Sequence, residues 1–283
     1  MAASSMLRAL HPLIESKRGR KLQLPPRLTR LYGTFRVPPE RRGAQVFTNF
    51  VSTLDGVVSL QTRGHSGGGD ISGFSIQDRM VMGLLRATAD VVLVGSGTLD
   101  ADRRHVWTAE EICPPLAREF QRLRRTMGKT VSPLNVVVTA SGNIDLNLPV
   151  FASGRVPAMV VTTPAGARRL GKQKPPRPVE VRTAGRSSKE IAPRAVLETI
   201  TRGHPGGRIL VEGGPRLLAS FYDERLIDEQ FLTLAPQIAG RDVDDGRLTL
   251  VMGKIFAPSH PLWGTLVDAR RGDRLLFLRY TFP

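Results

Sequence analysis

Glu212-Gly213-Gly214-Pro215 is the stretch from which the fold can be worked out. It follows the apolar run Arg208-Ile209-Leu210-Val211 and precedes a helical pattern at residues 216–222, so a strand, two glycines and a helix start come in succession. Glycines let the backbone approach a ligand without a Cβ in the way, and the free N–H groups of a helix's first turn attract anions. The stretch therefore suits a phosphate group, although a plain strand-to-helix turn has the same pattern.

A second glycine turn, Gly95-Ser96-Gly97-Thr98, directly follows the apolar run at residues 91–94. In an open parallel sheet, ligands gather at the carboxyl ends of the strands, so two such turns could line one crevice with room for a dinucleotide. Asp100 stands where the dinucleotide fingerprint has its third glycine, and no lysine follows as in a P-loop. The usual Rossmann and P-loop interpretations therefore fail.

From Gln45 onward, apolar β-like runs alternate with helical patterns. This alternation predicts a mostly parallel sheet with helices on both faces. The closing stretch from Gln230 has no long helix, which predicts antiparallel strands at one edge. Strands are expected at residues 46–51, 91–94, 136–138, 159–161, 209–211, 231–234 and 275–278, and helices at residues 75–87, 115–127, 191–202 and 215–225.

Composition places the chain among ordinary globular proteins, with 283 residues, 41% of them hydrophobic and 23% charged. No stretch approaches the roughly 20 uninterrupted apolar residues of a spanning helix, and the N-terminus lacks a secretory signal pattern. The single cysteine, Cys113, fits a reducing compartment. We expect a cytoplasmic protein, and because the histidines show no metal-type spacing we expect no metal site.

The net charge of +16 is unevenly distributed. Residues 1–42 contain ten lysines and arginines against Glu15 and Glu40, together with two Pro-Pro pairs that favour extended, loosely packed chain. A basic balance can indicate nucleic acid, but Tyr32 and Phe35 are the only aromatic residues there on which bases could stack. We interpret this segment as a solvated extension or an arm that contacts another subunit, and expect no nucleic-acid partner.

Several motifs, in this order, carry a resemblance to a known family. The chain resembles the reductase domain of riboflavin biosynthesis, a pyrimidine reductase relative of dihydrofolate reductase. The motifs are Asn49-Phe50-Val51-Ser52-Thr53-Leu54-Asp55-Gly56, Ile71-Ser72-Gly73, Leu85-Arg86-Ala87, Asp90-Val91-Val92-Leu93-Val94-Gly95-Ser96-Gly97-Thr98 and Val211-Glu212-Gly213-Gly214-Pro215. The resemblance implies a three-layer α/β/α dihydrofolate reductase-like fold over residues 44–283, preceded by a basic extension at residues 1–43. The zinc signature of the deaminase often fused to this domain is missing.

The family binds NADPH across the crevice of the sheet, and the matching positions can be named one by one. The resemblance implies cofactor contacts at Val51, Gly95, Gly97, Thr98, Asp102, Ser141, Gly213, Gly214, Pro215 and Leu217. Bound NADPH would supply the hydride, so the protein must mainly orient the two reacting carbons. A homodimer is also implied.

On the substrate side, the family reduces the ribosyl C1′ of a phosphorylated ribosylamino-pyrimidine. The resemblance implies that Ser72, Arg86 and Glu212 hold this substrate, with Glu212 and Asp55 as catalytic candidates. Each has a plainer interpretation as well. Asp55 before a glycine is ordinary turn chemistry, and Arg86 at a helix end complements the helix dipole.

The run after Thr98 departs from the family pattern. There the family has Asp-Asp-Pro and then an arginine that grips the substrate phosphate, whereas here Asp102 is followed by Arg103 and Arg104, and Ala109 stands near the expected arginine. Either Arg103 or Arg104 replaces that contact, or both are exposed to solvent. Three hypotheses stay open: the riboflavin-pathway reductase, a related reductase of another heterocyclic or carbonyl compound, and a non-enzymatic basic binding protein.

Overall fold

A ten-stranded sheet runs through the part of the chain that the computed structural model describes, which is residues 7–39, 43–173, 178–185, 190–202, 207–242, 244 and 246–283. The strand order is β1-β13-β14-β11-β4-β10-β6-β7-β8-β9, parallel from β11 to β9 and antiparallel from β1 to β11. Its strands are β1 (His11–Ile14), β4 (Ala44–Ser52), β6 (Val91–Gly95), β7 (Leu134–Thr139), β8 (Ala158–Thr162), β9 (Glu180–Thr183), β10 (Gly207–Val211), β11 (Glu229–Leu234), β13 (Thr265–Arg271) and β14 (Leu276–Thr281). Two further pairs of strands form separate two-stranded sheets, β2 (Arg20–Lys21) with β3 (Arg36–Val37) and β5 (Val57–Ser59) with β12 (Leu248–Thr249). The mostly parallel sheet with antiparallel C-terminal strands is confirmed.

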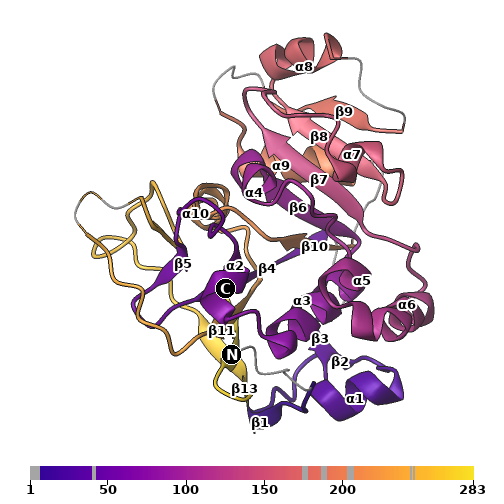
Figure 1. Cartoon of the computed structure of the whole chain (residues 1–283), viewed down its shortest axis with the longest axis vertical. Coiled ribbons are helices and arrows are strands. Elements are labelled where there is room, and N and C mark those ends of the chain that lie inside the picture. The colour runs from indigo at the N-terminus through magenta and orange to yellow at the C-terminus, as the bar shows by residue number, and fades with distance from the viewer. Residues whose placement is uncertain are drawn as a thin grey trace.

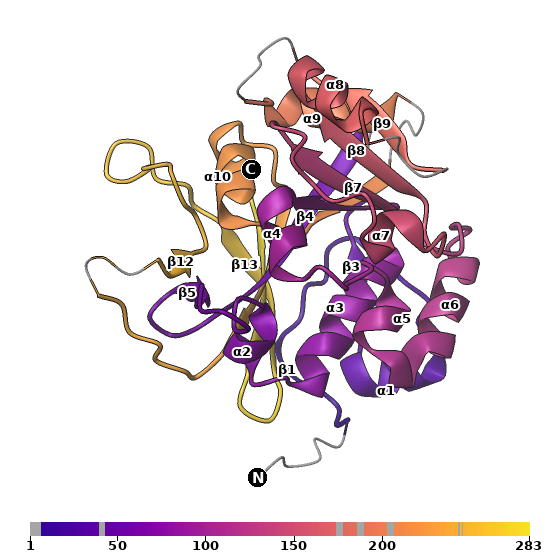
Figure 2. The same ribbon diagram turned by 45° about the horizontal axis from the view of Figure 1, so that its top comes forward.

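Helices cover both faces of this sheet (Figure 1). They are α1 (Pro26–Tyr32), α2 (Gly68–Ser72), α3 (Ile76–Thr88), α4 (Ser96–Ala101), α5 (Ala109–Ile112), the 3-10 turn η1 (Pro114–Leu116), α6 (Ala117–Thr126), α7 (Pro149–Ala152), α8 (Pro164–Gly171), α9 (Pro193–Thr201) and α10 (Pro215–Asp223). Helices α3, α5 and α6 pack together, and both views show them grouped (Figure 2).

Period-2 alternation along the central strands produces the three layers. In β6, Val92 and Val94 belong to the core shared with α3 and α6, whereas Val91 and Leu93 belong to the core shared with α9 and α10. Successive side chains of a strand point to opposite faces, so a strand buried on both faces reads as a continuous apolar run. The three-layer α/β/α arrangement expected from the sequence is therefore confirmed.

The N-terminal segment packs differently from what its composition indicates. Strand β1 adds an edge strand beside β13, and Leu28, Tyr32 and Phe35 are buried in the main core. The buried Arg270 donates to the carbonyl oxygens of Tyr32 at 2.7 Å and Thr34 at 3.0 Å. The expectation of a loosely packed, solvated segment is wrong for residues 7–39, because apolar side chains between the basic ones cover the sheet.

No helix in the described part of the chain is long and apolar enough to cross a membrane.

Candidate active site

The two glycine turns lie side by side at the carboxyl ends of β6 and β10, which are neighbouring parallel strands. The Gly95 N–H donates to the Gly213 carbonyl oxygen at 2.8 Å, and the Glu212 N–H donates to the Leu93 carbonyl oxygen at 3.0 Å. Helix α4 begins directly after Gly95 and α10 directly after Gly214. Two helix N-termini, with their free N–H groups, therefore meet at one edge of the sheet.

Glycine is required at position 213 and leaves open space at position 97. Gly213 has φ +128°, and a Cβ there would lie 3.0 Å from Thr98 Oγ1. The Gly213–Gly214 peptide bond is cis, and a Cβ on Gly214 would lie 3.3 Å from the same hydroxyl. A Cβ on Gly97 would meet nothing within 4 Å. Bare backbone beside open space is what a phosphate approaching a helix start needs.

Arg86 and Glu212 form a buried ion pair next to these turns. Arg86 lies in the last turn of α3 with 1% of its surface exposed, and the Glu212 side chain is 5% exposed. The Arg86 Nη2 donates to Glu212 Oε2 at 2.7 Å, and its Nε donates to both carboxylate oxygens at 3.1 Å. Because burying two charges is costly, a buried pair is weak evidence for a stabilising role. Both residues were expected on the substrate side.

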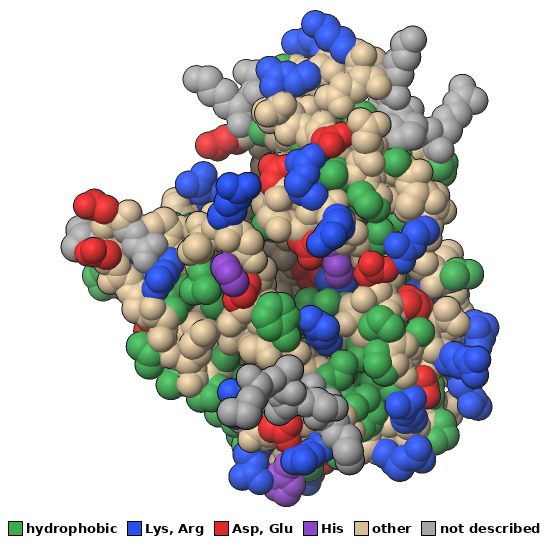
Figure 3. Space-filling view, viewed as in Figure 1, with side chains coloured by type: hydrophobic (Ala, Val, Ile, Leu, Met, Phe, Trp, Pro, Cys, Tyr) green, Lys and Arg blue, Asp and Glu red, His purple; other side chains and the backbone are tan. Residues whose placement is uncertain are grey.

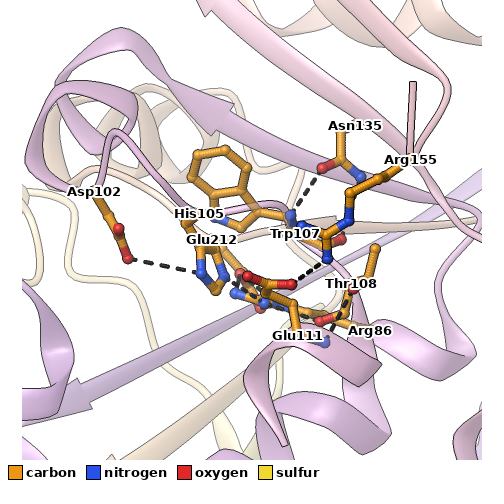
Figure 4. Close-up of polar contacts among 9 residues, drawn as sticks. All are labelled: Arg86, Asp102, His105, Trp107, Thr108, Glu111, Asn135, Arg155 and Glu212. Carbon is orange, nitrogen blue, oxygen red and sulfur yellow. Dashed lines mark hydrogen bonds and ion pairs between the residues drawn. The ribbon is translucent and has the colours of Figure 1, made fainter. Parts of the chain in front are cut away.

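His105 contacts the opposite edge of the same guanidinium (Figure 4). Arg86 Nη1 donates to His105 Nε2 at 2.7 Å and to the Thr108 carbonyl oxygen at 3.1 Å. Burial, followed by the charge of Arg86, lowers the pKa of His105 to about 2. The other ring nitrogen, Nδ1, lies 3.7 Å from Asp102 Oδ2. The sequence analysis missed His105, because a lone histidine carries no local signal.

Asp78, in the first turn of α3, is a further residue of the site that the sequence did not indicate. Asp78 is buried, and burial raises its pKa to about 6, although hydrogen bonds from Thr233 and Ser72 act in the opposite direction. The charge of Glu212 also contributes to the increase. Ser72, expected on the substrate side, is itself buried at the end of α2. Its hydroxyl therefore has a protein partner at hand.

Asp55 lies apart from this cluster, in the turn between β4 and β5. Its carboxylate accepts from Thr53 Oγ1 at 2.5 Å and from the backbone N–H groups of Ala239 at 3.1 Å and Gly240 at 2.7 Å. The Thr53 hydrogen bond and the backbone donors hold the pKa of Asp55 at about 2. These contacts anchor the loop after β11, and the catalytic role expected for Asp55 stays a prediction.

The arginines that follow Asp102 lie at the surface. Arg103 Nη2 donates to Asp145 Oδ2 at 2.8 Å, on the loop after β7, and Arg104 is exposed. Asp102 itself ends α4 as its C-cap. Farther along, Arg155 pairs with Glu111 beside Trp107 and Arg86 (Figure 4). Arg103 is therefore paired with a carboxylate at the surface, and the substrate-phosphate contact expected for Arg103 or Arg104 stays a prediction.

The remaining expected cofactor residues line the neighbouring strand ends. Val51 lies near the end of β4, where a Cβ on Gly68 would come within 2.8 Å of its Cγ1, so the start of α2 packs closely on it. Ser141 follows β7 and is exposed, its hydroxyl accepting from the Asn143 N–H at 3.1 Å. Pro215 and Leu217 belong to the first turn of α10.

These elements surround a hollow near the middle of the face shown in Figure 3, with acidic, basic and histidine side chains gathered at its edge. The turns at Gly95 and Gly213 border the Arg86–Glu212 pair, because Glu212 directly precedes Gly213. The arrangement can accept an anion at the helix starts and a polar ring beside the ion pair.

Known proteins resemble this chain in sequence and in fold. Residues 44–250 match the family model described as RibD C-terminal domain. A curated relative, 2,5-diamino-6-ribosylamino-4(3H)-pyrimidinone 5′-phosphate reductase of Archaeoglobus fulgidus, is 29% identical over 198 residues, covering 70% of this chain and 83% of that protein.

Solved structures also share the fold. A pyrimidine reductase-like protein from Corynebacterium diphtheriae superposes with a TM-score of 0.65 at 20% identity, covering 85% of this chain and 92% of that one. The riboflavin biosynthesis reductase of Saccharomyces cerevisiae superposes with a TM-score of 0.58 at 15% identity, covering 87% of this chain and 93% of that one.

Proposed function

The chain belongs to the RibD C-terminal domain family, and from that premise we propose that it is an NADPH-dependent reductase of riboflavin biosynthesis. Its substrate is 2,5-diamino-6-ribosylamino-4(3H)-pyrimidinone 5′-phosphate, as in the Archaeoglobus relative, or the corresponding 5-amino-6-(5-phosphoribosylamino)uracil. The observation that carries the proposal is the buried Arg86–Glu212 pair directly beside two glycine turns on adjacent strands.

The residues at these turns fit a dinucleotide. In the first turn of α10, Arg216 and Leu217 offer N–H groups, whereas Pro215 has none. Gly97 and Gly214 carry no Cβ to obstruct the approach, which suits the pyrophosphate of NADPH. Ser141 follows β7, the strand adjacent to β6, and in this proposal its exposed hydroxyl binds the 2′-phosphate of the cofactor. Bound NADPH would supply the hydride that reduces the ribosyl C1′ and opens its bond to O4′, with a proton from solvent completing the O4′ hydroxyl.

Arg86 and Glu212 position the acceptor in this proposal. Ion-paired with Arg86, the Glu212 carboxylate acts as a hydrogen-bond acceptor, which suits the amino and ring N–H groups of the pyrimidine. Burial excludes water from this contact and strengthens it. A homodimer and a cytoplasmic location belong to the same proposal.

A related reductase with a different acceptor is the second candidate. Ala109 stands where the family has its phosphate-binding arginine, and Arg103 is held by Asp145. Both observations favour a changed substrate pocket beside a retained cofactor site.

The test is NADPH oxidation with each pyrimidine phosphate as acceptor, with the ribityl product identified by mass. We expect oxidation with at least one of them and none without an acceptor. NADPH binding without oxidation would favour the second candidate. Absence of NADPH binding, together with salt-sensitive binding to nucleic acid, would support the basic binding protein instead.

A further inference from the structure

The hydrogen bonds of Arg86 use nearly all of its donors. A guanidinium has five N–H groups. The Nε–H and one Nη2–H go to Glu212, and the Nη1 group donates to His105 Nε2 and to the Thr108 carbonyl oxygen. A single Nη2–H remains, so Arg86 can donate one hydrogen bond to the substrate but cannot bind it in a bidentate manner.

The contact with Arg86 determines the tautomer of His105. Arginine only donates, so the Nε2 atom at 2.7 Å must be unprotonated and the ring proton must sit on Nδ1, facing Asp102. The cations Arg86 and Arg79 from α3 and Arg155 from the loop before β8 all oppose protonation of this ring, while Asp102 is the acidic group facing it. Burial acts in the same direction, so the imidazole stays neutral.

Packing against Trp107 also fixes the orientation of the His105 ring. Trp107 packs against it edge to face, with centroids 5.2 Å apart. The Trp107 backbone is fixed in turn by Asn135 on β7, which accepts from its N–H at 2.9 Å and donates to its carbonyl oxygen at 3.2 Å. The buried Trp107 therefore fixes the ring beside Arg86.

These contacts form a row of side chains, Asp102, His105, Arg86 and Glu212, from the expected cofactor side to the expected substrate side (Figure 4). We propose that His105 is a positioning residue that holds the Arg86 guanidinium edge-on to Glu212 and leaves one Nη2–H for the acceptor. The inference rests on the proposed reductase function, and it assigns a role to the part of the chain that departs from the family pattern.

Kinetics of two variants test this role. His105→Ala removes the acceptor for Arg86 Nη1, and we expect kcat/KM for the pyrimidine phosphate to fall about tenfold, the effect of one lost hydrogen bond. The dissociation constant of NADPH should stay unchanged. His105→Gln places an amide oxygen near the position of Nε2 and should recover most of the activity. Failure of Gln to recover activity, or an unaffected Ala variant, would overturn the proposal.

His11→Ala is the matched control, because His11 is exposed on the edge strand β1 at the far side of the sheet from β6. We expect this variant to keep the wild-type values of kcat/KM for the pyrimidine phosphate and of the dissociation constant of NADPH. A loss equal to that of His105→Ala would show that the effect is not specific to the contact with Arg86.

Nitrogen-15 NMR of the histidine-labelled protein tests the tautomer without requiring turnover. Comparison with His105→Gln identifies the His105 signals. We expect an unprotonated Nε2 and a protonated Nδ1 from pH 8 to pH 5. Titration of this ring near pH 6.5, or a proton on Nε2, would overturn the proposal even if the substrate turned out to be a different molecule.

Discussion

Arg86 Nη2 lies 2.7 Å from Glu212 Oε2. This ion pair connects the C-terminal end of α3 to the turn between β10 and α10, which lies 126 positions farther along the sequence. Both side chains are almost completely buried. Replacing such a pair by two apolar side chains of similar volume often leaves the folded protein as stable or makes it more stable. Removing only one partner is strongly destabilising, because the other charge is left buried and unpaired. A buried pair beside a hollow is therefore better explained by binding than by stability.

Glu212→Gln should lower both stability and turnover. The variant leaves the Arg86 charge buried without its counter-ion, and we expect the free energy of unfolding in urea to fall by about 3 kcal/mol. NADPH affinity should be retained, because Glu212 precedes the glycines that form the helix start. The control is Glu180→Gln, which breaks the exposed pair with Arg182 and should cost less than about 1 kcal/mol. Equal effects of the two variants, or normal turnover of Glu212→Gln, would contradict this assignment.

Gly97→Val tests where the cofactor approaches the backbone. A side chain at position 97 would point into open space, so folding should be unaffected, whereas NADPH affinity should fall at least about tenfold because the side chain fills the approach to α4. Isothermal titration measures the affinity. Gly171→Val, also in open space but at the end of α8, is the control and should bind NADPH normally. An unchanged affinity of Gly97→Val would remove this turn from the cofactor site.

Gly214→Val is a harsher version of the same test. A Cβ at position 214 would lie 3.3 Å from Thr98 Oγ1, and a branched side chain would also cover the start of α10, so we expect NADPH binding to be abolished. Thermal unfolding should be measured alongside, because crowding at Thr98 also strains the turn between β10 and α10. Normal affinity in a folded Gly214→Val protein would refute the proposed position of the pyrophosphate.

The parallel core and the glycine turns could be predicted because their signals are local. Each apolar run becomes a strand buried on both faces, and Ser75 caps α3 where the helical pattern begins. The closeness of the two turns follows from the pairing of β10 with β6, which parallel topology makes natural.

The environment of the site could not be predicted, because it depends on contacts between distant segments. Asp78 is an ordinary first-turn acid by sequence, and only its burial against Thr233 and Ser72 makes it unusual. His105 gains its role from Arg86 on another helix, and Asp55 gains its partners from the loop at Ala239. In the N-terminal segment the many arginines indicated a solvated chain, although the leucines between them pack on the sheet.

Asp78 should make the protein less stable as the pH rises through the mildly acidic range. Burial raises its pKa from 3.8 to about 6, so the folded protein holds the proton more tightly than the unfolded chain does. Stability is therefore lost between about pH 4 and pH 6, by about 3 kcal/mol for a shift of this size. The side chain of Asp78→Asn is uncharged at every pH, so this variant does not lose that stability. The free energy of unfolding of the variant, relative to that of the wild type, should therefore increase between pH 4 and pH 7.

Urea unfolding of both proteins at pH 4 and pH 7 measures this difference. Asp223→Asn is the control, since Asp223 pairs with Lys254 at the surface and its substitution should change stability by less than about 1 kcal/mol at either pH. A stability difference between Asp78→Asn and wild type that is the same at both pH values would contradict the buried, protonated state.

Leu28→Ala tests whether the N-terminal segment is part of the fold. Leu28 in α1 is 0% exposed and packs in the main core, so the substitution removes buried methyl groups and leaves a cavity. We expect a loss of about 2 to 5 kcal/mol in the free energy of unfolding. Leu13→Ala in the same segment is the control, because Leu13 is 53% exposed on β1 and its loss should cost less than about 1 kcal/mol. If both variants unfolded at the same urea concentration as the wild type, α1 would contribute nothing to stability, and the segment would be the loosely packed chain that its composition indicates.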